Sequence, residues 1–307
     1  MKIYRPLFWD QIKLISALLY PLSLITLLIN IIKKTKVKRS FKIKSICVGN
    51  LYVGGTGKTP LSIKINNILK KKYKTAFIKK KYFDQLDEQN ILKSHGNLIC
   101  SKCRNTALEI ATTKKYDVAI LDDGLQEKSL NYDISIACFN SSDGIGNGLL
   151  IPAGPLREVV SEIKNYDAIF LNGEKNNKKL YQYFKKLNKN IQIFEAKYVP
   201  LNLSSFNLKK NFLFFCGLGN PSEFERTLKK YKFKIKEKII YPDHYNFSNF
   251  DILSLKKLAK KKNLNIITTE KDYLRLNKKN RKNIKFLRVD LRIKNLVKFS
   301  KFLRERL

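Results

Sequence analysis

A glycine-rich turn that ends in Gly-Lys-Thr, at residues 53–60, is the part of the sequence best suited to chemistry. A short apolar run at residues 45–48 precedes it, and apolar residues follow it at helical spacing. A turn of this kind between a strand and a helix binds nucleotide phosphates, because its backbone and the helix N-terminus direct N–H groups at anionic oxygens. The pattern therefore predicts a triphosphate-binding loop.

Each residue of this loop receives a predicted role. Lys58 would reach the β- and γ-phosphates, and the Thr59 hydroxyl would bind Mg²⁺. The predicted nucleotide-binding residues are Gly54, Gly55, Thr56, Gly57, Lys58 and Thr59. The first glycine of the common G-x-x-x-x-G-K-S/T pattern would fall at Tyr52, so the loop is a Gly-Gly-x-Gly-Lys-Thr variant. The alternative is a flexible glycine-rich connection, and the flanking strand and helix patterns argue against it.

Two adjacent carboxylates supply the acidic partner that such a loop needs. Asp122 and Asp123 follow the apolar residues 118–121 and precede a glycine. Mg²⁺ takes oxygen ligands and is often held through a carboxylate at the carboxyl end of a neighbouring strand. Both residues are therefore predicted to take part in metal binding, and the sequence leaves open which one touches the ion. An ordinary strand running into an Asp-Gly turn is the simpler alternative.

Short apolar runs alternate with helical patterns beyond residue 41, which predicts an α/β fold with a mostly parallel, P-loop NTPase-like sheet. Strands are expected at residues 45–48, 75–78, 118–121, 134–139, 168–171, 212–216, 265–268 and 284–289. A polar connection around residues 198–211 suggests a domain boundary. The expected parts are an N-terminal membrane-associated helix (1–40), a P-loop nucleotide-binding domain (41–200) and a smaller α/β domain with a closing C-terminal helix (201–307).

The N-terminal apolar segment contains no charged residue between positions 14 and 32, which is about the length needed to cross a bilayer. Polar residues and a proline interrupt it, namely Ser16, Pro21, Ser23, Thr26 and Asn30. A cleaved signal peptide is disfavoured because no small-residue cleavage site follows, and a buried core helix is the simpler alternative. The pattern favours membrane attachment, spanning or lying in the interface. The basic cluster at residues 33–39 would then face anionic lipid on the cytoplasmic side.

The formal net charge of +37 over 307 residues favours anionic partners such as nucleic acid, lipid headgroups or phosphorylated substrates. A compositional bias toward lysine would produce the same charge without any partner. The five cysteines are scattered, which indicates reduced thiols rather than a disulfide framework. A zinc site is disfavoured, since the chain has only one C-x-x-C pair, Cys100 and Cys103, and two histidines.

Several longer motifs occur together and are not explained by a phosphate loop alone. They are Val48-Gly49-Asn50, Asp122-Asp123-Gly124-Leu125-Gln126, the Gly-Asn-Gly-Leu-Leu-Ile-Pro-Ala-Gly-Pro-Leu-Arg-Glu run at residues 146–158, Cys216-Gly217-Leu218-Gly219-Asn220-Pro221, Asp243-His244-Tyr245-Asn246-Phe247 and Thr268-Thr269-Glu270-Lys271-Asp272. In these motifs the chain strongly resembles the tetraacyldisaccharide 4′-kinase family of lipid A synthesis. The resemblance spans nearly the whole chain, including the apolar N-terminus.

The resemblance implies a membrane-associated enzyme at the cytoplasmic face of the inner membrane. Such an enzyme transfers the γ-phosphoryl group of ATP to the 4′-hydroxyl of a tetraacylated glucosamine disaccharide 1-phosphate, using Mg²⁺. Because this lipid acceptor stays in the bilayer, the apolar helix and the basic surface would bring the kinase to an anionic membrane surface. No nucleic-acid partner is expected.

The resemblance also implies a catalytic aspartate assisted by a histidine. Asp87, in the Asp87-Glu88 pair, matches the aspartate that activates the sugar hydroxyl, and His244 matches the histidine. With Lys58 they form the expected catalytic set. Three positions depart from the family pattern: residues 80–82 read Lys-Lys-Tyr in place of Arg-Gly-Tyr, Leu86 replaces a glycine, and Glu127 replaces a histidine.

Charge neutralisation and substrate contacts complete the expected site, because phosphoryl transfer depends mainly on positioning and on offsetting charge. Arg157 is expected to offset charge on the transferring group, and Glu158 to bind metal or orient Arg157. A salt bridge in a loop is the simpler role for Glu158. Tyr82, Gln126 and Arg157 are assigned to substrate or phosphate, and Thr59, Asp122, Asp123 and Glu158 to the metal.

Two functions of other classes compete with a lipid kinase. A P-loop GTP-binding switch would need an Asn-Lys-x-Asp sequence, whereas residues 269–272 read Thr-Glu-Lys-Asp. A nucleic-acid-stimulated ATPase would account for the net charge, but the sequence has no basic-aromatic binding motif. Neither alternative accounts for the Pro-Leu-Arg-Glu block.

Overall fold

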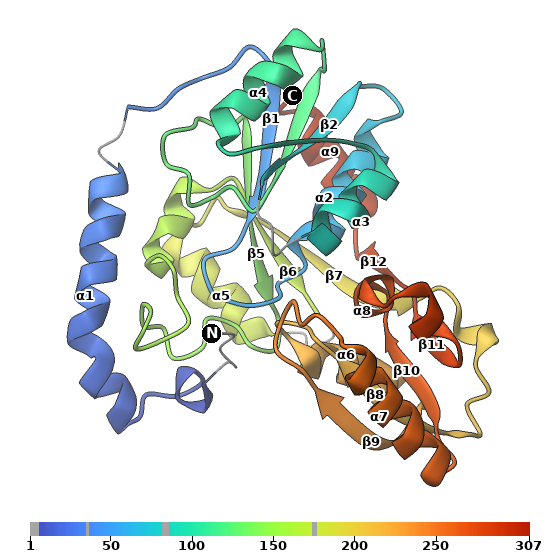
Figure 1. Cartoon of the computed structure of the whole chain (residues 1–307). Coiled ribbons are helices and arrows are strands. Elements are labelled where there is room, and N and C mark those ends of the chain that lie inside the picture. Colours follow the sequence, from blue (N-terminus) through green and yellow to red (C-terminus); the bar gives the residue numbers. More distant parts are fainter. Residues whose placement is uncertain (1–5, 35–36, 82–85, 174–176) are drawn as a thin grey trace. The chain divides into compact units, whose positions relative to one another are not determined.

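The computed structural model describes residues 6–34, 37–81, 86–173 and 177–307, and the chain divides into two compact units. The larger unit contains the described parts of residues 5–83, 92–197 and 291–307. The smaller unit contains the described parts of residues 84–91 and 198–290. Figure 1 shows the helices and strands of both units and labels most of them.

The larger unit is built on a sheet that has eight strands among the described residues, in the order β12-β7-β6-β5-β1-β4-β2-β3. The strands are β1 (Lys44–Gly49), β2 (Thr75–Lys80), β3 (Asn97–Ser101), β4 (Val118–Asp122), β5 (Ile134–Asn140), β6 (Ala168–Asn172), β7 (Gln192–Pro200) and β12 (Val289–Ile293). From β3 to β7 all neighbouring strands pair in parallel. The central strands β1, β4, β5 and β6 are buried, which is why their sequences read as continuous apolar runs.

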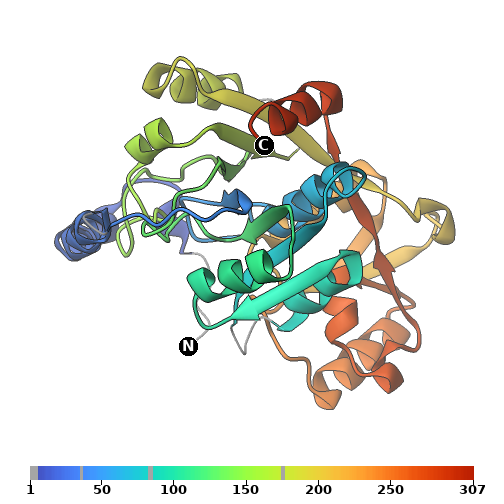
Figure 2. The same cartoon turned by 90° about the horizontal axis from the view of Figure 1, so that it is seen from above.

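Helices cover both faces of this sheet (Figures 1 and 2). They are α2 (Lys58–Leu69), α4 (Arg104–Thr113), α5 (Lys178–Leu187) and α9 (Leu296–Arg304). Helix α3 (Leu86–His95) is divided between the two units, and its residues from Leu92 onward belong to the larger one. On one face, α4 and α5 join a core with Leu121, Phe139 and Leu171. On the other face, Phe299 of α9 packs on Phe170 of β6, because successive strand residues point to opposite sides.

The strand order changes direction beside β1, which pairs with β4 on one side and β5 on the other. In open parallel sheets the crevice at the carboxyl ends of the strands beside such a point is where ligands bind. The loop that follows β1 is the glycine-rich turn of residues 53–60. The topology therefore places the predicted phosphate loop at the usual ligand position of this fold.

The smaller unit has a four-stranded parallel sheet in the order β11-β10-β8-β9. Its elements are β8 (Asn211–Cys216), α6 (Pro221–Lys230), β9 (Lys234–Ile240), α7 (Asn249–Lys261), β10 (Asn265–Thr269), α8 (Glu270–Arg275) and β11 (Ile284–Leu287). Alternate residues of β8 point to two separate cores: Phe214 lies with Phe224 of α6, and Phe215 lies with Ile252 of α7. The unit is thus a small α/β layer structure with an apolar core on each side of its sheet.

The predicted α/β fold is confirmed, but β3, β7 and β9 were not among the expected strands, and two further details differ from the sequence prediction. The single strand expected at residues 284–289 is two strands, because β11 ends at Leu287 and β12 begins at Val289 in the other sheet. The closing C-terminal helix is present as α9, but it belongs to the larger unit. Phe299 is fully buried and packs against Phe170 and Phe194 there, which accounts for its place.

The N-terminal segment forms one helix, α1 (Leu14–Lys34), as the apolar pattern predicts. It is long and apolar enough to cross a membrane, and only 11% of its most apolar window is buried. A buried core helix is therefore the wrong description. The helix ends at Lys33 and Lys34, whose positive charges suit the negative end of the helix dipole.

Candidate active site

The glycine-rich turn connects β1 to α2 in the conformation that a phosphate loop requires. Gly57 caps α2 with a left-handed backbone (φ +80°), a conformation in which a side chain would be strained. No side chain caps the first turn of α2, so its N–H groups are left for another acceptor. The Thr56 hydroxyl is buried and has no hydrogen-bond partner among the described residues. This loop has the donors that a phosphate group accepts from.

The carboxylates of Asp122 and Asp123 lie at the carboxyl end of β4, beside the start of α2. The Thr59 hydroxyl donates to Asp122 Oδ2 at 3.0 Å, and Lys58 Nζ lies 3.7 Å from Asp123 Oδ1. Burial alone would raise the pKa of Asp123, but the charges of Lys58 and Arg157 outweigh it and lower this pKa. Asp123 adopts a left-handed backbone (φ +64°), a strained state that is common at functional sites.

A lysine that the sequence prediction missed completes the neighbourhood of Asp122. Lys79, near the end of β2, places its Nζ 2.8 Å from Asp122 Oδ2, and both side chains are almost fully buried. Ser62 of α2 donates to the other carboxylate oxygen at 3.3 Å. Lys79 stands in a run of three lysines, which by sequence is indistinguishable from a solvated surface run.

Arg157 contacts two residues of the Asp122–Gln126 motif and also Asn50, which follows β1. Its Nη1 lies 3.5 Å from Asp123 Oδ1, 3.4 Å from Asn50 Oδ1 and 3.5 Å from Gln126 Oε1. Gln126 in turn donates to the Asn50 carbonyl at 2.7 Å. Arg104, a second residue that sequence reasoning missed, donates to the main-chain carbonyl of Asp123. The structure thus brings Arg157 and Gln126 together with the acidic pair, as the sequence predicts.

Glu158 is directed away from this group. Its buried carboxylate accepts from Lys128 Nζ at 2.9 Å and from the Tyr166 hydroxyl at 2.9 Å. Burial and the adjacent Glu158 charge raise the pKa of Tyr166 well above its usual value, which keeps that hydroxyl a donor. The metal role expected for Glu158 is not supported, because its carboxylate is bound to Lys128 and Tyr166, whereas Asp122 is bound to Thr59 at the start of α2; the simpler salt-bridge role fits. Tyr82, assigned to substrate, lies outside the described residues.

The oxygen atoms near α2 fit a magnesium ion shared with a nucleotide. Among the residues that the structure describes, no group of three or more His, Cys, Asp or Glu is placed to hold an ion unaided. Mg²⁺ usually takes one or two protein oxygens and completes its shell with phosphate and water. Thr59 and Asp122, whose side-chain oxygens lie 3.0 Å apart, form such a minimal set.

The smaller unit contains the second predicted group, Asp87 and His244. His244 Nδ1 lies 3.2 Å from Asp87 Oδ1, although the two residues are 157 positions apart in the chain. His244 also has a left-handed backbone (φ +56°), which the loop after β9 imposes on it. The pairing that the family resemblance implies is therefore present in the structure.

Two cations from α8 surround the Asp87 carboxylate. Arg275 reaches Asp87 Oδ2 through Nη2 at 2.5 Å and Nε at 3.2 Å, and Lys271 Nζ lies 3.3 Å from the same oxygen. Burial would raise the pKa of Asp87, but the hydrogen bond from His244 and the charges of Lys271 and Arg275 hold it far below its usual value. Asp87 is thus held as a carboxylate, which can accept a proton but has none to donate.

Arg275 is itself fixed by buried groups. Its Nη1 donates to Asp272 Oδ1 at 2.9 Å and to the Gly217 carbonyl at 3.0 Å. Asp272 is also held by the Thr269 hydroxyl at 2.7 Å. The Thr-Glu-Lys-Asp motif therefore supports the Asp87 group. Arg275 was missed by the sequence prediction, although it follows Lys271 by four residues and so shares its helix face.

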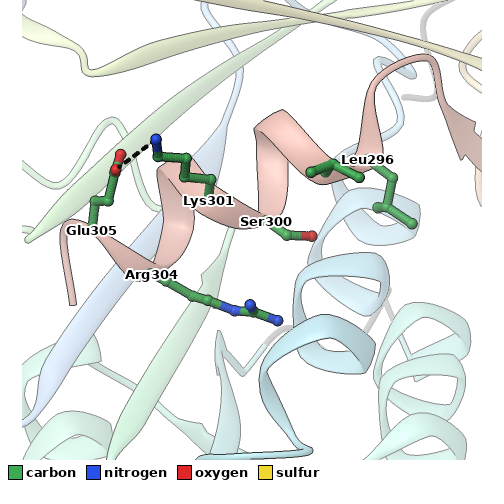
Figure 3. Close-up of a pocket in the computed structure, with 6 residues that line it drawn as sticks. Leu296, Ser300, Lys301, Arg304 and Glu305 are labelled. Atoms are coloured by element: carbon green, nitrogen blue, oxygen red, sulfur yellow. Dashed lines mark ion pairs between the residues drawn. The ribbon is translucent and has the colours of Figure 1, made fainter.

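The pocket drawn in Figure 3 is not a candidate active site. It is lined by Leu296, Val297, Ser300, Lys301, Arg304 and Glu305, all from α9 or the residue that follows it. Lys301 and Glu305 form an ion pair across one helical turn, 3.5 Å apart. A hollow lined by one exposed helix face offers no converging polar groups of the kind that a catalytic site needs.

Comparisons with known proteins agree with the motifs. The family model described as tetraacyldisaccharide-1-P 4′-kinase matches residues 15–307. A tetraacyldisaccharide 4′-kinase of Pelagibacter ubique is 46% identical over 297 residues, which cover 95% of this chain and 95% of the relative. One of Rickettsia canadensis, with the same name, is 36% identical over 96% of this chain and 95% of its own length.

A solved structure shows the same fold. The crystal structure of an LpxK from Aquifex aeolicus, determined in complex with ATP, superposes with a TM-score of 0.71 at 23% identity. The match covers 95% of this chain and 99% of that chain. The P-loop NTPase-like fold is therefore confirmed, and the switch and nucleic-acid alternatives are not favoured. The chain belongs to the tetraacyldisaccharide-1-P 4′-kinase family.

Proposed function

We propose that this chain transfers the γ-phosphoryl group of ATP to the 4′-hydroxyl of a tetraacylated glucosamine disaccharide 1-phosphate. The observation that carries the proposal is the pairing of Thr59 with Asp122 beside a glycine-rich helix N-terminus. This is the minimal arrangement for a magnesium-bound triphosphate. Membership of the kinase family over residues 15–307 supports the choice of acceptor.

The larger unit would bind the nucleotide. The N–H groups of residues 54–59 and the Lys58 ammonium would hold the phosphates, and Thr59 and Asp122 would hold Mg²⁺. When bound, the ion would offset negative charge on the transferring group. Arg157, 3.5 Å from Asp123, would contribute a second positive charge that is kept in place by Asn50 and Gln126.

Asp87 would accept the proton of the attacking hydroxyl, with His244 orienting it. The cations around Asp87 make it a weak base, since they hold its pKa far below the usual value. A weak base suffices where the transition state is loose, because bond formation to the attacking oxygen is then slight and the main requirement is orientation. His244, 3.2 Å from the carboxylate, would set the direction of that oxygen.

The enzyme would work at the cytoplasmic face of the inner membrane. Apolar side chains of α1 are exposed over its whole length, among them Leu14, Leu18, Leu28 and Ile32. Lys33 and Lys34 end the helix, where an anionic lipid surface would attract them. An apolar helix with basic residues at its end suits a kinase whose acceptor remains in the bilayer.

A radiolabelled phosphate-transfer assay tests the proposal. Purified protein in detergent, Mg²⁺, γ-labelled ATP and the disaccharide 1-phosphate should yield a doubly phosphorylated lipid. Lys58→Ala, Asp87→Ala and His244→Ala should each lower kcat by roughly 100-fold or more, because each removes a group that acts in the transition state. Lys70→Ala, an exposed lysine just after α2, is the matched control and should retain the full rate.

Two results would reject the proposal or part of it. Absence of labelled lipid with the wild-type protein would reject the kinase function. A full rate with Asp87→Ala, when Lys58→Ala is inactive, would remove Asp87 as the base and leave the kinase in place. In a nucleotide-competition experiment, protection of the protein by GTP but not by ATP would favour the GTP-binding alternative.

A further inference from the structure

The polar residues that interrupt the apolar N-terminal segment share one face of α1. Ser16, Ser23, Thr26 and Asn30 are separated by seven, three and four positions, the spacing of residues that lie above one another on a helix. We call these four residues the polar stripe. Ser16 is 0% and Ser23 is 3% exposed, whereas Leu18 is 71% and Leu28 is 59% exposed. The polar side of this apolar helix therefore faces protein.

Three residues of the polar stripe, Ser23, Thr26 and Asn30, hydrogen-bond to main-chain atoms of the segment from Leu150 to Arg157. The Ser23 hydroxyl donates to the Leu150 carbonyl at 2.9 Å and accepts from the Ala153 N–H at 3.1 Å. The Thr26 hydroxyl donates to the Ile151 carbonyl at 2.8 Å. Figure 1 shows α1 beside this part of the chain, which lies between β5 and β6. Residues on successive turns of the helix thus bind one short irregular segment.

The last of these contacts is to Arg157 itself. Asn30 Nδ2 donates to the Arg157 carbonyl at 2.8 Å. On its other side, the Arg157 N–H donates to the Leu51 carbonyl at 2.7 Å, and the Val53 N–H donates to the Pro155 carbonyl at 2.8 Å. The main chain of residues 155–157 is therefore held between α1 and the residues that lead into the phosphate loop.

The first half of the Gly146–Glu158 motif is also bound to residues at the N-terminal end of the described chain. Asn147 Nδ2 donates to the Phe8 carbonyl at 3.1 Å, and the Trp9 indole donates to the Pro152 carbonyl at 3.0 Å. A Cβ on Gly146 would lie 2.6 Å from the Trp9 carbonyl, so only glycine allows this approach. The N-terminal residues and the Gly146–Glu158 motif are consequently one packed structure, which explains why both carry specific sequences.

We propose that α1 is a positioning element of the active site as well as a membrane attachment. Its polar stripe holds the main chain of residues 150–157, and this places the Arg157 guanidinium beside Asp123, Asn50 and Gln126. The catalytic part of this inference rests on the proposed function, and the structural part does not. If α1 served only as an anchor, apolar residues in place of Thr26 and Asn30 would strengthen its membrane binding, since apolar side chains favour the bilayer.

The variants Thr26→Val and Asn30→Leu separate the two roles, because both make α1 more apolar. Each should float with phosphatidylethanolamine–phosphatidylglycerol vesicles at least as well as the wild type. In detergent, where attachment is irrelevant, Asn30→Leu should lower kcat by about tenfold, which is what the loss of one well-placed, part-buried hydrogen bond amounts to. KM for ATP should change much less. Thr26→Val should have a smaller effect in the same direction.

Hydrogen exchange gives a readout that does not depend on activity. Amides of residues 147–157 should exchange faster in both variants, while those of the smaller unit should keep their rates. Thr113→Val is the matched control, because the Thr113 hydroxyl bonds within its own helix, α4, to the Glu109 carbonyl at 3.0 Å. It should change neither kcat nor exchange in residues 147–157.

The outcomes are distinguishable. Unchanged exchange in residues 147–157 in both variants would overturn the positioning role. Faster exchange with an unchanged kcat in Asn30→Leu would overturn its catalytic consequence. If the wild-type protein phosphorylates no lipid, the proposed function fails, and the exchange comparison still decides whether α1 holds the segment. Should Asn30→Leu fail to fold, Thr26→Val, which keeps the shape of the side chain, decides both points.

Discussion

Lys79 Nζ lies 2.8 Å from Asp122 Oδ2, and this oxygen also accepts the hydrogen bond from Thr59. The side chains of Lys79 and Asp122 are 3% and 0% exposed. The carboxylate that we assign to Mg²⁺ therefore already has a buried protein cation as a partner. The negative charge of Asp122 is therefore balanced by Lys79 when no metal ion is bound.

Replacing Lys79 by methionine should destabilise the metal-free protein by about 3 kcal/mol or more, because it leaves a buried carboxylate without its partner. Urea unfolding in the presence of EDTA measures this. Lys44→Met is the control, since Lys44 pairs with Asp133 at 3.0 Å in a far more exposed place, and it should cost less than about 1 kcal/mol. Equal losses in the two variants would contradict the importance of the buried pair.

Replacing Lys271 by methionine should shift the acid limb of the kcat–pH profile. Lys271 is one of the cations that lower the pKa of Asp87, so its loss should raise that pKa toward the ordinary value of about 3.9. The limb should move to higher pH by about one unit, with little change at pH 7. Lys271→Arg keeps the charge and should keep the profile; a shift in both variants would point to a structural effect instead.

The same group should govern part of the stability at low pH. The folded-state pKa of Asp87 is depressed, so its contribution is fully present above the unfolded value near pH 4 and is lost as the pH falls further. The groups in contact with Asp87 are His244, Lys271 and Arg275, and these in turn contact Glu88, Asp243 and Asp272. Lys271→Met should therefore lose less stability than the wild type between about pH 5 and pH 3, as measured by urea unfolding.

Replacing Phe299 by alanine should destabilise the larger unit. The ring is 0% exposed and lies 4.9 Å from Phe194 and 5.8 Å from Phe170, centre to centre. The cavity should cost about 3–5 kcal/mol in urea unfolding. Val297→Ala, at an 82% exposed position of the same helix, should change the stability by less than about 0.5 kcal/mol. A small effect of Phe299→Ala would place α9 outside the core of this unit.

Alkylation should discriminate between the cysteines. Cys103 is exposed, and hydrogen bonds from the Thr106 side chain and N–H lower its pKa. Burial raises the pKa of Cys47 to about 12 and also raises that of Cys138 and Cys216. Iodoacetamide at neutral pH should therefore modify Cys103 first, as followed by peptide mass spectrometry, and modify the buried thiols only in urea. Early labelling of Cys47 would show that its surroundings open readily.

The parts of the fold that the sequence predicted are those with local signals. Central strands such as β5 are buried on both faces and so read as apolar runs, and the turn before Lys58 is defined by adjacent glycines. In contrast, β9 reads Lys-Ile-Lys-Glu-Lys-Ile-Ile at the edge of its sheet and was missed. Edge strands tolerate charge on their exposed positions, which removes the apolar signal.

The site was only partly predictable for a similar reason. Asp122 follows an apolar strand and could be recognised from its neighbours, whereas Asp87 and His244 meet across 157 positions and were found only through the family resemblance. The sequence around Lys79 gives no local signal of a role in the site, and that around Arg275 gives only its spacing of four residues from Lys271. Both act through burial beside a carboxylate, and burial of a charged side chain is decided by the tertiary fold.

The inward-facing serines and asparagine of α1 bear on how a water-soluble form of this protein should be made. Deleting the helix would remove the side-chain donors to the carbonyl groups of Ile151 and Arg157, and would leave the Leu150 carbonyl with the Gly154 N–H. Replacing exposed leucines on its outer face, such as Leu18 and Leu28, with glutamate or lysine would instead remove the apolar surface and keep the hydrogen bonds of the inner face.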